Sequence, residues 1–399
     1  MTVWPRLITL ALAITVATGA AFGLEADPVG LRIADDGTIL KDGEPYYGVG
    51  VNYMDAFTRC LKDPRDTSYV KGFATLAAHN IPFARLNFGG FYPVEWKRYQ
   101  DDPERYFALM DGVVQAAEAA GVGLIPSLFW WSACIPDLVG EPRNRWGDRN
   151  SKTHAFMNGY VREVVSRYKD SPAIWAWEFG NEYNLAVDLP NAESHRPQSP
   201  VRLGCPAERG PDDDLSSEMV RTALVAFGEA VRGIDPHRPI SSGDSLPRPS
   251  AHHQRVALSW KSDSQKEFRA HLQLMTPEPL NLVSVHIYPH AGKNRFGVEK
   301  VRYRELLAEV ALGARERKKG LFVGEFGPPP DDKAPWSRDS ARAEGEKLFR
   351  ALMESSVQLA AFWVFDFAWQ EKSMSVTTEN HRAGYLDVLQ EANQKLATR

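Results

Sequence analysis

The segment Ile174–Asn184, IWAWEFGNEYN, is an apolar run that ends in an Asn-Glu pair after Gly180. Such a run predicts a buried strand with its acidic residue, Glu182, at the carboxyl end. A second segment of the same kind, Leu321–Gly327 (LFVGEFG), places Glu325 in the same way. Strands that share one barrel or sheet bring their carboxyl ends to one edge, so we expect the two carboxylates to lie close together.

Strand-like and helix-like runs alternate along the rest of the chain. The strand-like runs are 47–52, 82–88, 122–129, 173–179, 239–243, 282–288, 321–326 and 359–366. Stretches with apolar residues about three and four apart lie between them, among them 103–120, 154–168, 215–234, 303–317 and 341–353. Eight such units predict an α/β fold, the (β/α)8 TIM barrel. A doubly wound sheet is the alternative, but no GxGxxG turn follows the first strand.

The composition fits one large catalytic domain, expected over 24–399. The chain has 399 residues, 43% of them hydrophobic, which is enough for one sizeable core. A small antiparallel hairpin is expected around the turns Asp36-Gly37 and Asp42-Gly43, before the barrel. The polar, Pro-rich stretch 189–214 is expected to be a long loop after the fourth strand. The net charge is −4, and acidic and basic residues are interspersed, so the sequence has no basic cluster of the kind that binds nucleic acid or an anionic membrane. A neutral substrate is therefore expected.

The first residues have the pattern of a secretory signal peptide, expected over 1–23. MTVWPR is followed by the apolar segment LITLALAITVATGAAFG, and Ala21-Phe22-Gly23 is a plausible cleavage site. The mature protein is therefore expected to begin near Leu24 and to be secreted or periplasmic. The alternative is an uncleaved membrane anchor, since the run approaches the length of a span.

No metal or cofactor is expected. Cys60, Cys134 and Cys205 all lie in segments interpreted as loops, and three cysteines allow at most one internal disulfide. A metal-dependent barrel hydrolase is an alternative class, but the pair His252-His253 lies in a region interpreted as a loop. An HxH motif at the first strand would be expected instead.

Two glutamates at strand ends are what a retaining glycosidase requires, one protonated and one ionised. At these motifs the chain resembles clan A of the glycoside hydrolases, and within it family 5, the cellulase and mannanase family. The resemblance covers essentially the whole mature chain. SPAIWAWEFGNEYN is similar to the fourth-strand motif of the family, which makes Asn181-Glu182 the counterpart of its Asn and acid/base Glu. GLFVGEFG is similar to the seventh-strand motif, which makes Glu325 the counterpart of the nucleophile.

Three further motifs extend the resemblance. VSVHIYP places His286 and Tyr288 on one side of the sixth strand, and the corresponding pair flanks the nucleophile in the family. FARLNF supplies Arg85, which resembles the arginine that hydrogen-bonds the nucleophile. AFWVFDF supplies Trp363, which resembles the eighth-strand tryptophan under the sugar at the cleavage point.

The chemistry sets expectations for these side chains. Arg85 and Tyr288 should both lie within hydrogen-bond reach of Glu325 and favour its ionised form. Glu182 should have a raised pKa, through a dry setting or the nearby charge of Glu325, and should act as a base after the glycosyl-enzyme forms. Asn181 is expected to donate to the sugar 2-hydroxyl.

Several neighbouring residues have competing interpretations. Glu178 shares its side of the strand with Glu182 but lies deeper, where a structural ion pair is expected. Trp175 and Trp177 are expected in the core. Sugar stacking and packing are both open for the tryptophans near strand ends, which are Trp130, Trp131 and Trp369.

The chain also departs from the family pattern. Tyr183 stands where many members have Pro, and Phe129-Trp130-Trp131 stands where many have a His near the third-strand end. AWEFGNE, the Trp-bearing third strand and HIYP together most resemble the β-mannanase branch.

The resulting hypothesis is a secreted retaining β-glycoside hydrolase, endo-β-1,4-mannanase-like, that cleaves a β-linked glycan by double displacement. The alternatives are a β-glucan-active (cellulase-like) or exo-acting member of the clan, and a catalytically silent carbohydrate-binding barrel. A silent barrel could keep the tryptophans but has no need of both Glu182 and Glu325. The pattern specifies no oligomeric state.

Overall fold

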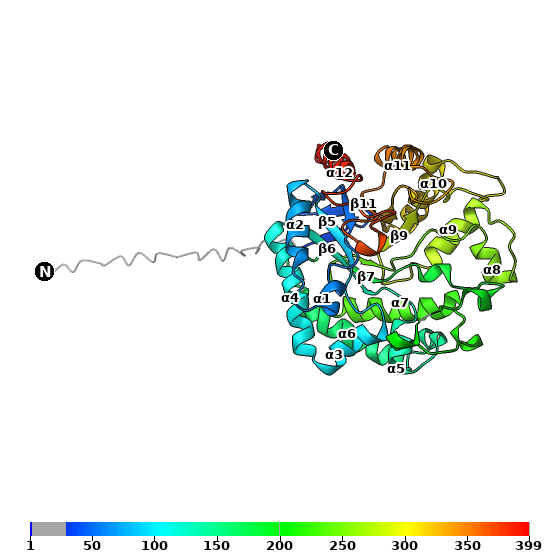
Figure 1. Cartoon of the computed structure of the whole chain (residues 1–399), viewed down its shortest axis with the longest axis horizontal. Helices are drawn as coiled ribbons and strands as arrows, with labels where there is room; N and C mark the ends of the chain where they lie inside the picture. The colour runs from blue at the N-terminus through cyan, green and yellow to red at the C-terminus, as the bar shows by residue number, and fades with distance from the viewer. Residues whose placement is uncertain (2–28, 199, 399) are drawn as a thin grey trace.

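Eight parallel strands close into a barrel whose neighbours follow chain order, from β4 through β11 and back to β4 (Figure 1). The computed structural model describes residues 1, 29–198 and 200–398, so the expected signal peptide lies, except for Met1, outside the described residues. The (β/α)8 prediction is confirmed. The strands are β4 (Gly48–Asn52), β5 (Phe83–Asn87), β6 (Gly123–Phe129), β7 (Trp177–Gly180), β8 (Ile240–Ser241), β9 (Leu282–Ile287), β10 (Gly320–Phe326) and β11 (Leu359–Phe362).

Every residue of these strands is buried, which explains why the strands appear in the sequence as continuous apolar runs rather than alternating ones. Trp175 and Trp177 are both buried, as predicted for core residues. Trp175 belongs to a cluster inside the barrel with Phe83 and Phe322, whereas Trp177 packs in the layer between strands and helices.

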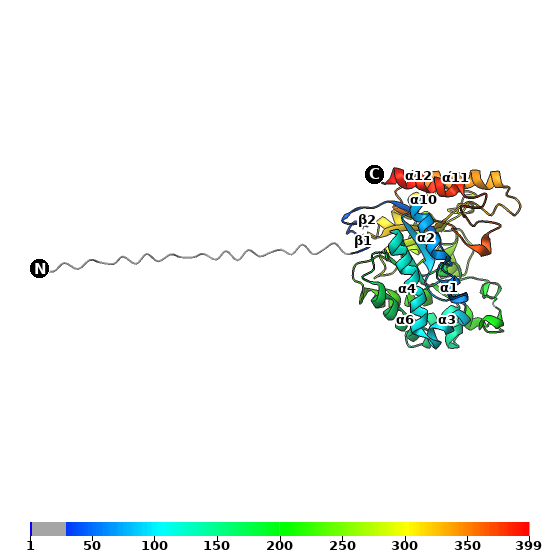
Figure 2. The ribbon, with the colours of Figure 1, turned by 60° about the vertical axis from the view of Figure 1, so that its left-hand side comes forward.

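Helices surround the barrel, and α10, α11 and α12 share one flank in both views (Figures 1 and 2). Local signals set their limits. The Asp102 carboxylate caps α4 by accepting from Arg105 N, and Gly121 ends the helix in the left-handed conformation. The helices are α1 (Thr58–Lys62), α2 (Ser68–Ala78), α3 (Pro93–Asp101), α4 (Pro103–Ala120), α5 (Cys134–Val139), α6 (Lys152–Tyr168), α7 (Ser217–Arg232), α8 (Ala251–Ala257), α9 (Gln265–Leu274), α10 (Tyr303–Arg315), α11 (Arg338–Met353) and α12 (Gly384–Leu396).

The expected hairpin is a small antiparallel sheet of three strands, β1 (Leu31–Ile33), β2 (Ile39–Lys41) and β3 (Glu44–Pro45). Leu31 and Ile39 are fully buried among the residues that fill the amino-terminal end of the barrel. The sheet therefore covers the end opposite to the strand ends that carry Glu182 and Glu325.

Two loop predictions are wrong. Cys60 lies in α1 and Cys134 begins α5, whereas Cys205 lies in a loop as expected, and the three buried cysteines form no disulfide among the described residues. The pair His252-His253 lies in α8 rather than in a loop. These helices are seven residues or shorter, too short to show a clear apolar period. Among the helices of the described residues, none combines the length and apolar character that a membrane span requires.

Candidate active site

Glu182 follows β7 in a turn that holds its backbone in the left-handed region, with φ of 54°. This conformation is costly for a residue with a side chain and is retained here by surrounding contacts. The Glu182 amide donates to the carbonyl of Gly243 at 3.0 Å. A Cβ on Gly243 would lie 1.9 Å from the Gly180 oxygen, so this close approach of two strand ends requires glycine. The turn projects the Glu182 carboxyl group into the mouth of the barrel, where its side chain is 31% exposed.

Glu325 lies near the end of β10, where the pairing of β10 with both neighbours shifts register between Val323 and Phe326. Such a bulge changes the direction of a side chain next to a strand end. A Cβ on Gly324 would lie 2.9 Å from Nε2 of His286, so glycine lets the His286 ring pack against the bulge. The Glu325 side chain is only 6% exposed.

Two donors hold the Glu325 carboxylate. Arg85 Nη1 donates to Oε1 at 2.9 Å, and the Tyr288 hydroxyl donates to Oε2 at 2.6 Å. Both contacts were predicted from the sequence, and both are confirmed. Burial and the charge of Glu325 raise the pKa of Tyr288, which keeps this hydroxyl protonated and able to donate.

Arg85 is the centre of a buried polar network and has no exposed side-chain surface. Its Nε donates to Glu178 Oε1 at 2.7 Å, which confirms the structural ion pair expected for Glu178. Its Nη2 donates to Asn181 Oδ1 at 2.8 Å, and its Nη1 also reaches Asn52 Oδ1 at 3.0 Å. The guanidinium lies 4.5 Å from the centre of the Trp130 ring. Residues on or next to four other strands, β4, β6, β7 and β10, contact this one side chain. Its position therefore fixes the geometry of the site.

Glu182 and Glu325 face each other across the mouth of the barrel. One oxygen of each carboxylate and one ring nitrogen of His286 all lie within 4.8 Å of one another. Nδ1 of His286 is 3.0 Å from Glu182 Oε1 and 3.5 Å from Glu325 Oε1. The sequence motifs of the fourth, sixth and seventh strands therefore converge on one point.

The expected rise in the pKa of Glu182 is not found in the free cleft. Burial raises this pKa, but hydrogen bonds from His286 and Ser245 and the charges of His286 and Arg85 together lower it by more, so the net pKa lies below the ordinary value. The sequence indicated His286 beside the nucleophile but not its direct contact with Glu182.

A cavity of about 410 Å³ lies over the two glutamates. Asn181, Tyr288 and Trp363 line it, as predicted. The lining residues that were not predicted from the sequence include His290, Trp336, Gln370 and Met374. His290 directly follows the HIYP motif, so the motif could have indicated it as a lining residue. Its ring lies 5.9 Å from that of Trp336. Trp336 lies in a loop, where no pattern of apolar residues indicates which way a side chain points.

The remaining tryptophans differ in their placement. Trp130 is buried with its ring 6.3 Å from that of Trp363 and does not line the cavity. Trp131 stacks on Phe91 with ring centres 5.8 Å apart and does not line the cavity. Trp369 is 85% exposed. Trp363 alone of these four presents surface to the cavity, and its Nε1 donates to Gln370 at 2.8 Å.

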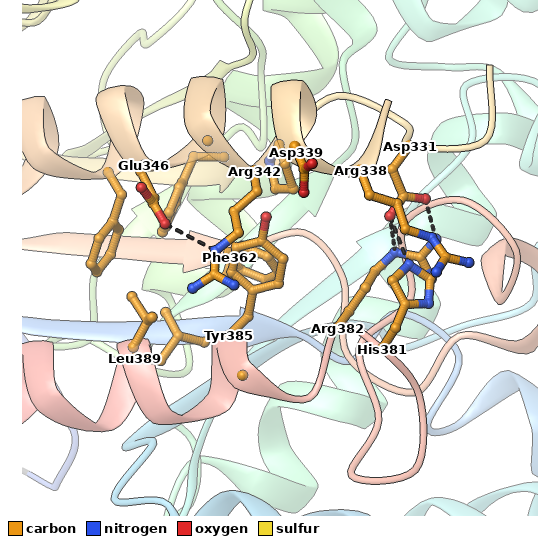
Figure 3. A pocket seen from close by; sticks show the side chains of 17 residues that line it. Asp331, Arg338, Asp339, Arg342, Glu346, Phe362, His381, Arg382, Tyr385 and Leu389 are labelled. Atoms are coloured by element: carbon orange, nitrogen blue, oxygen red, sulfur yellow. Dashed lines mark hydrogen bonds and ion pairs between the residues drawn. The ribbon is translucent and has the colours of Figure 1, made fainter. Parts of the chain in front are cut away.

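A second pocket, of about 230 Å³, lies outside the barrel between α11 and α12 (Figure 3). Its floor is aromatic and includes Tyr385. Two ion pairs lie at its rim, Asp331 with Arg382 and Glu346 with Arg342. Because Glu182 and Glu325 line the cavity at the strand ends and not this pocket, that cavity is the better candidate for an active site.

A parallel (β/α)8 barrel with two neighbouring glutamates, at the ends of its fourth and seventh strands, has the architecture of a glycoside hydrolase. Residues 65–368 match the cellulase family, glycosyl hydrolase family 5, and the chain belongs to this family.

Relatives and solved structures agree with this assignment. A probable mannan endo-1,4-β-mannosidase F of Aspergillus flavus is 42% identical over 141 residues, which are 34% of this chain and 24% of the relative. The chain thus matches about a quarter of the length of such curated relatives. The endo-1,4-β-mannanase of Rhizomucor miehei has a TM-score of 0.65 at 15% identity, covering 93% of this chain and 100% of that one. An exo-β-1,4-mannosidase from Opitutaceae bacterium strain TAV5 has a TM-score of 0.63 at 16% identity, covering 91% and 63%. At these identities the structures show a shared fold.

Proposed function

We propose that the protein is a retaining β-glycoside hydrolase in which Glu325 is the nucleophile and Glu182 the acid/base. The close approach of the two carboxylates carries this proposal. Oxygens within 4.8 Å of each other suit the short separation of retaining enzymes, about 5 to 5.5 Å, and leave no room for the water that an inverting enzyme places between sugar and base.

The unequal surroundings of the two glutamates support the division of roles. Glu325 is nearly buried and accepts hydrogen bonds from Arg85 and Tyr288, so its carboxylate is fixed in position for attack on the anomeric carbon. Glu182 is more exposed and lies beside a histidine, where it can exchange a proton with the leaving oxygen and later with water.

Substrate would change the protonation of Glu182. A sugar in the cavity removes water from its partly exposed carboxyl group, and this desolvation favours the protonated acid. Asn181 supports the same binding mode: its Oδ1 already accepts from Arg85, so its amide N–H groups remain available to a sugar hydroxyl at the cavity wall.

A β-linked mannan is the proposed substrate, because the curated relatives are named mannan endo-1,4-β-mannosidases. Trp363 and Trp336 offer flat apolar surfaces for pyranose rings at this cavity. A β-glucan is the second candidate, since the matching family is described as cellulase. We propose no nucleic-acid partner.

The long loop after the fourth strand supports internal cleavage. Arg209 of this loop pairs with Asp137 of α5 at 2.7 Å, which anchors the loop to that helix. No described residue of 189–214 lines the cavity. An exo-acting enzyme would need a loop that closes one end of its cleft, so an endo mode is favoured.

One experiment tests the proposed function. Purified protein is incubated with mannan, β-glucan, xylan and galactan, and the products are sized while proton NMR follows the anomeric configuration of the first products. Mannan should give a mixture of oligosaccharides whose new reducing ends are initially β. Glu325→Ala should give none. First products in the α configuration would refute the retaining mechanism, and activity on β-glucan alone would refute the choice of mannan.

A further inference from the structure

We propose that Arg382 is a positioning residue for the cavity wall that the loops after β10 and β11 form. This inference rests on the proposed function and deepens it, because it assigns a task to an arginine that lies outside the active-site cavity. Arg382 lies between β11 and α12 and lines the second pocket, beside α11 and α12 (Figure 3). Its side chain is only 3% exposed.

The loop after β10 contributes to both pockets. Its Asp331 lines the second pocket, whereas Pro329 and Pro330, directly before it, line the active-site cavity. Trp336, farther along the same loop, lines the cavity as well. One short loop therefore carries both the Asp331 carboxylate and part of the cavity wall, so a contact that fixes Asp331 also fixes that part of the wall.

The loop after β11 supplies another part of the wall, through Trp363, Gln370 and Met374. The backbone carbonyl of Gln370 accepts three N–H groups at 3.0 Å, those of residues 373–375. Oε1 of the same Gln370 accepts from Nε1 of Trp363 at 2.8 Å. The orientation of the Trp363 ring, which offers its apolar face to a sugar, therefore depends on where the segment 370–375 lies.

The Arg382 guanidinium joins the two loops. Its Nε and Nη2 donate to the two carboxylate oxygens of Asp331, with 3.1 Å between Nε and Oδ2. Its other N–H groups donate to three backbone carbonyls of the second loop, those of Glu371 at 2.9 Å, Lys372 at 2.8 Å and Ser375 at 3.4 Å. All five N–H groups of the guanidinium thus have acceptors, and its planar fork fixes one loop relative to the other.

The Asp331 carboxylate is held in its charged form. Its side chain is 11% exposed, and its Oδ2 also lies 2.8 Å from Nε2 of His381 (Figure 3). Burial raises the pKa of Asp331, but the hydrogen bonds and charges of Arg382 and His381 together lower it by more. Breaking a buried ion pair on one side leaves an uncompensated charge, so this pair holds the two loops in one arrangement.

The substitution Arg382→Lys tests the inference, because lysine keeps the charge but cannot donate to Asp331 and to three carbonyls at once. On mannan we expect KM to rise about 10-fold while kcat changes less than about 3-fold, since a displaced Trp363 weakens ground-state and transition-state binding alike. A partly unfolded variant would instead show a lower kcat at an unchanged KM. The matched control is Arg342→Lys, at an exposed arginine on the rim of the same pocket, which should behave as the unmodified protein.

A double-mutant cycle shows whether Arg382 acts through Trp363. In a Trp363→Ala background, Arg382→Lys should raise KM by less than about 2-fold, because the apolar face that Arg382 positions is already gone. Asp331→Asn weakens the same ion pair from the other loop, so it should give the same pattern, and it replaces Arg382→Lys if that variant does not fold. Equal effects on KM in the two backgrounds, or a lower kcat at an unchanged KM, would overturn the inference.

Hydrogen exchange provides a test that needs no substrate. The amides of residues 373–375 should exchange at least about 10-fold faster in Arg382→Lys than in the unmodified protein, whereas Arg342→Lys should leave them unchanged. Unchanged exchange in Arg382→Lys would overturn the inference. If the unmodified protein cleaves none of the glycans, the proposed function is refuted instead, and the exchange rates still decide whether Arg382 holds this segment.

Discussion

Replacing Glu182 by alanine should separate the two steps of the proposed reaction. The change removes the acid but leaves Arg85 and Tyr288 bound to Glu325, so the nucleophile stays in position. A positioned general acid contributes about 10²- to 10⁴-fold, or roughly 3 to 5 kcal/mol of barrier. Mannan hydrolysis should fall by that factor. A dinitrophenyl β-mannoside should keep a fast first step, because its leaving group departs without a proton.

The assay is the release of dinitrophenol with and without sodium azide. In Glu182→Ala the glycosyl-enzyme should accumulate after an initial burst, since no base activates water. The truncated side chain leaves space beside His286, from which azide can attack and give the β-glycosyl azide. The substitution Glu371→Ala, at an exposed glutamate near the cleft, is the matched control for a Glu-to-Ala change. This variant should behave as the unmodified protein. Equal losses on mannan and on the activated substrate, or a retained azide product from Glu325→Ala, would show that the roles are assigned wrongly.

Three further outcomes are expected. Trp363→Ala should lower kcat/KM on mannan by about 10- to 100-fold through loss of its apolar face, whereas Trp369→Ala, at a residue 85% exposed, should change it less than about 2-fold. Burial raises the pKa of Asp244 from 3.8 to about 7, so its contribution to stability is fully present below about pH 4 and lost as pH rises through about 7. Asp244→Asn should remove this fall, about 4 kcal/mol, from urea unfolding measured between pH 4 and 8. Amino-terminal sequencing of exported protein should begin near Leu24, and an intact Met1 would favour the anchor.

The barrel could be predicted because each of its strands is buried on both faces. Such strands appear as continuous apolar runs, and the helices between them carry a clear period and their own end signals, as Asp102 and Gly121 do for α4. The short helices α1, α5 and α8 could not be predicted in the same way. Their positions depend on packing against distant elements, so Cys60, Cys134 and the histidine pair were assigned to loops.

The active-site residues that lie on or directly after barrel strands could be predicted from the sequence. Arg85 lies in the middle of β5, Tyr288 directly follows β9 and Glu325 is the next-to-last residue of β10, so the barrel itself brings these side chains to one place. Asp244 was missed because its role comes from an irregular segment: its Oδ1 accepts the amide of Asn184 at 3.1 Å and steadies the turn after Glu182. Trp336 was missed for the same reason.

The charges of the site explain how one histidine can influence both steps. Three carboxylates, those of Glu178, Glu182 and Glu325, surround one guanidinium, and Arg85 binds only the first and the last of them within the described chain. Glu182 instead lies 3.0 Å from Nδ1 of His286, and the hydrogen bond and charge of that ring are the main causes that lower its pKa. In the proposed mechanism the charge of Glu325 disappears when the glycosyl-enzyme forms, and its repulsion, which favours the protonated form of Glu182, disappears with it. The pKa of Glu182 then falls as its task changes from acid to base, and the hydrogen bond from His286 stabilises the carboxylate that attacks through water.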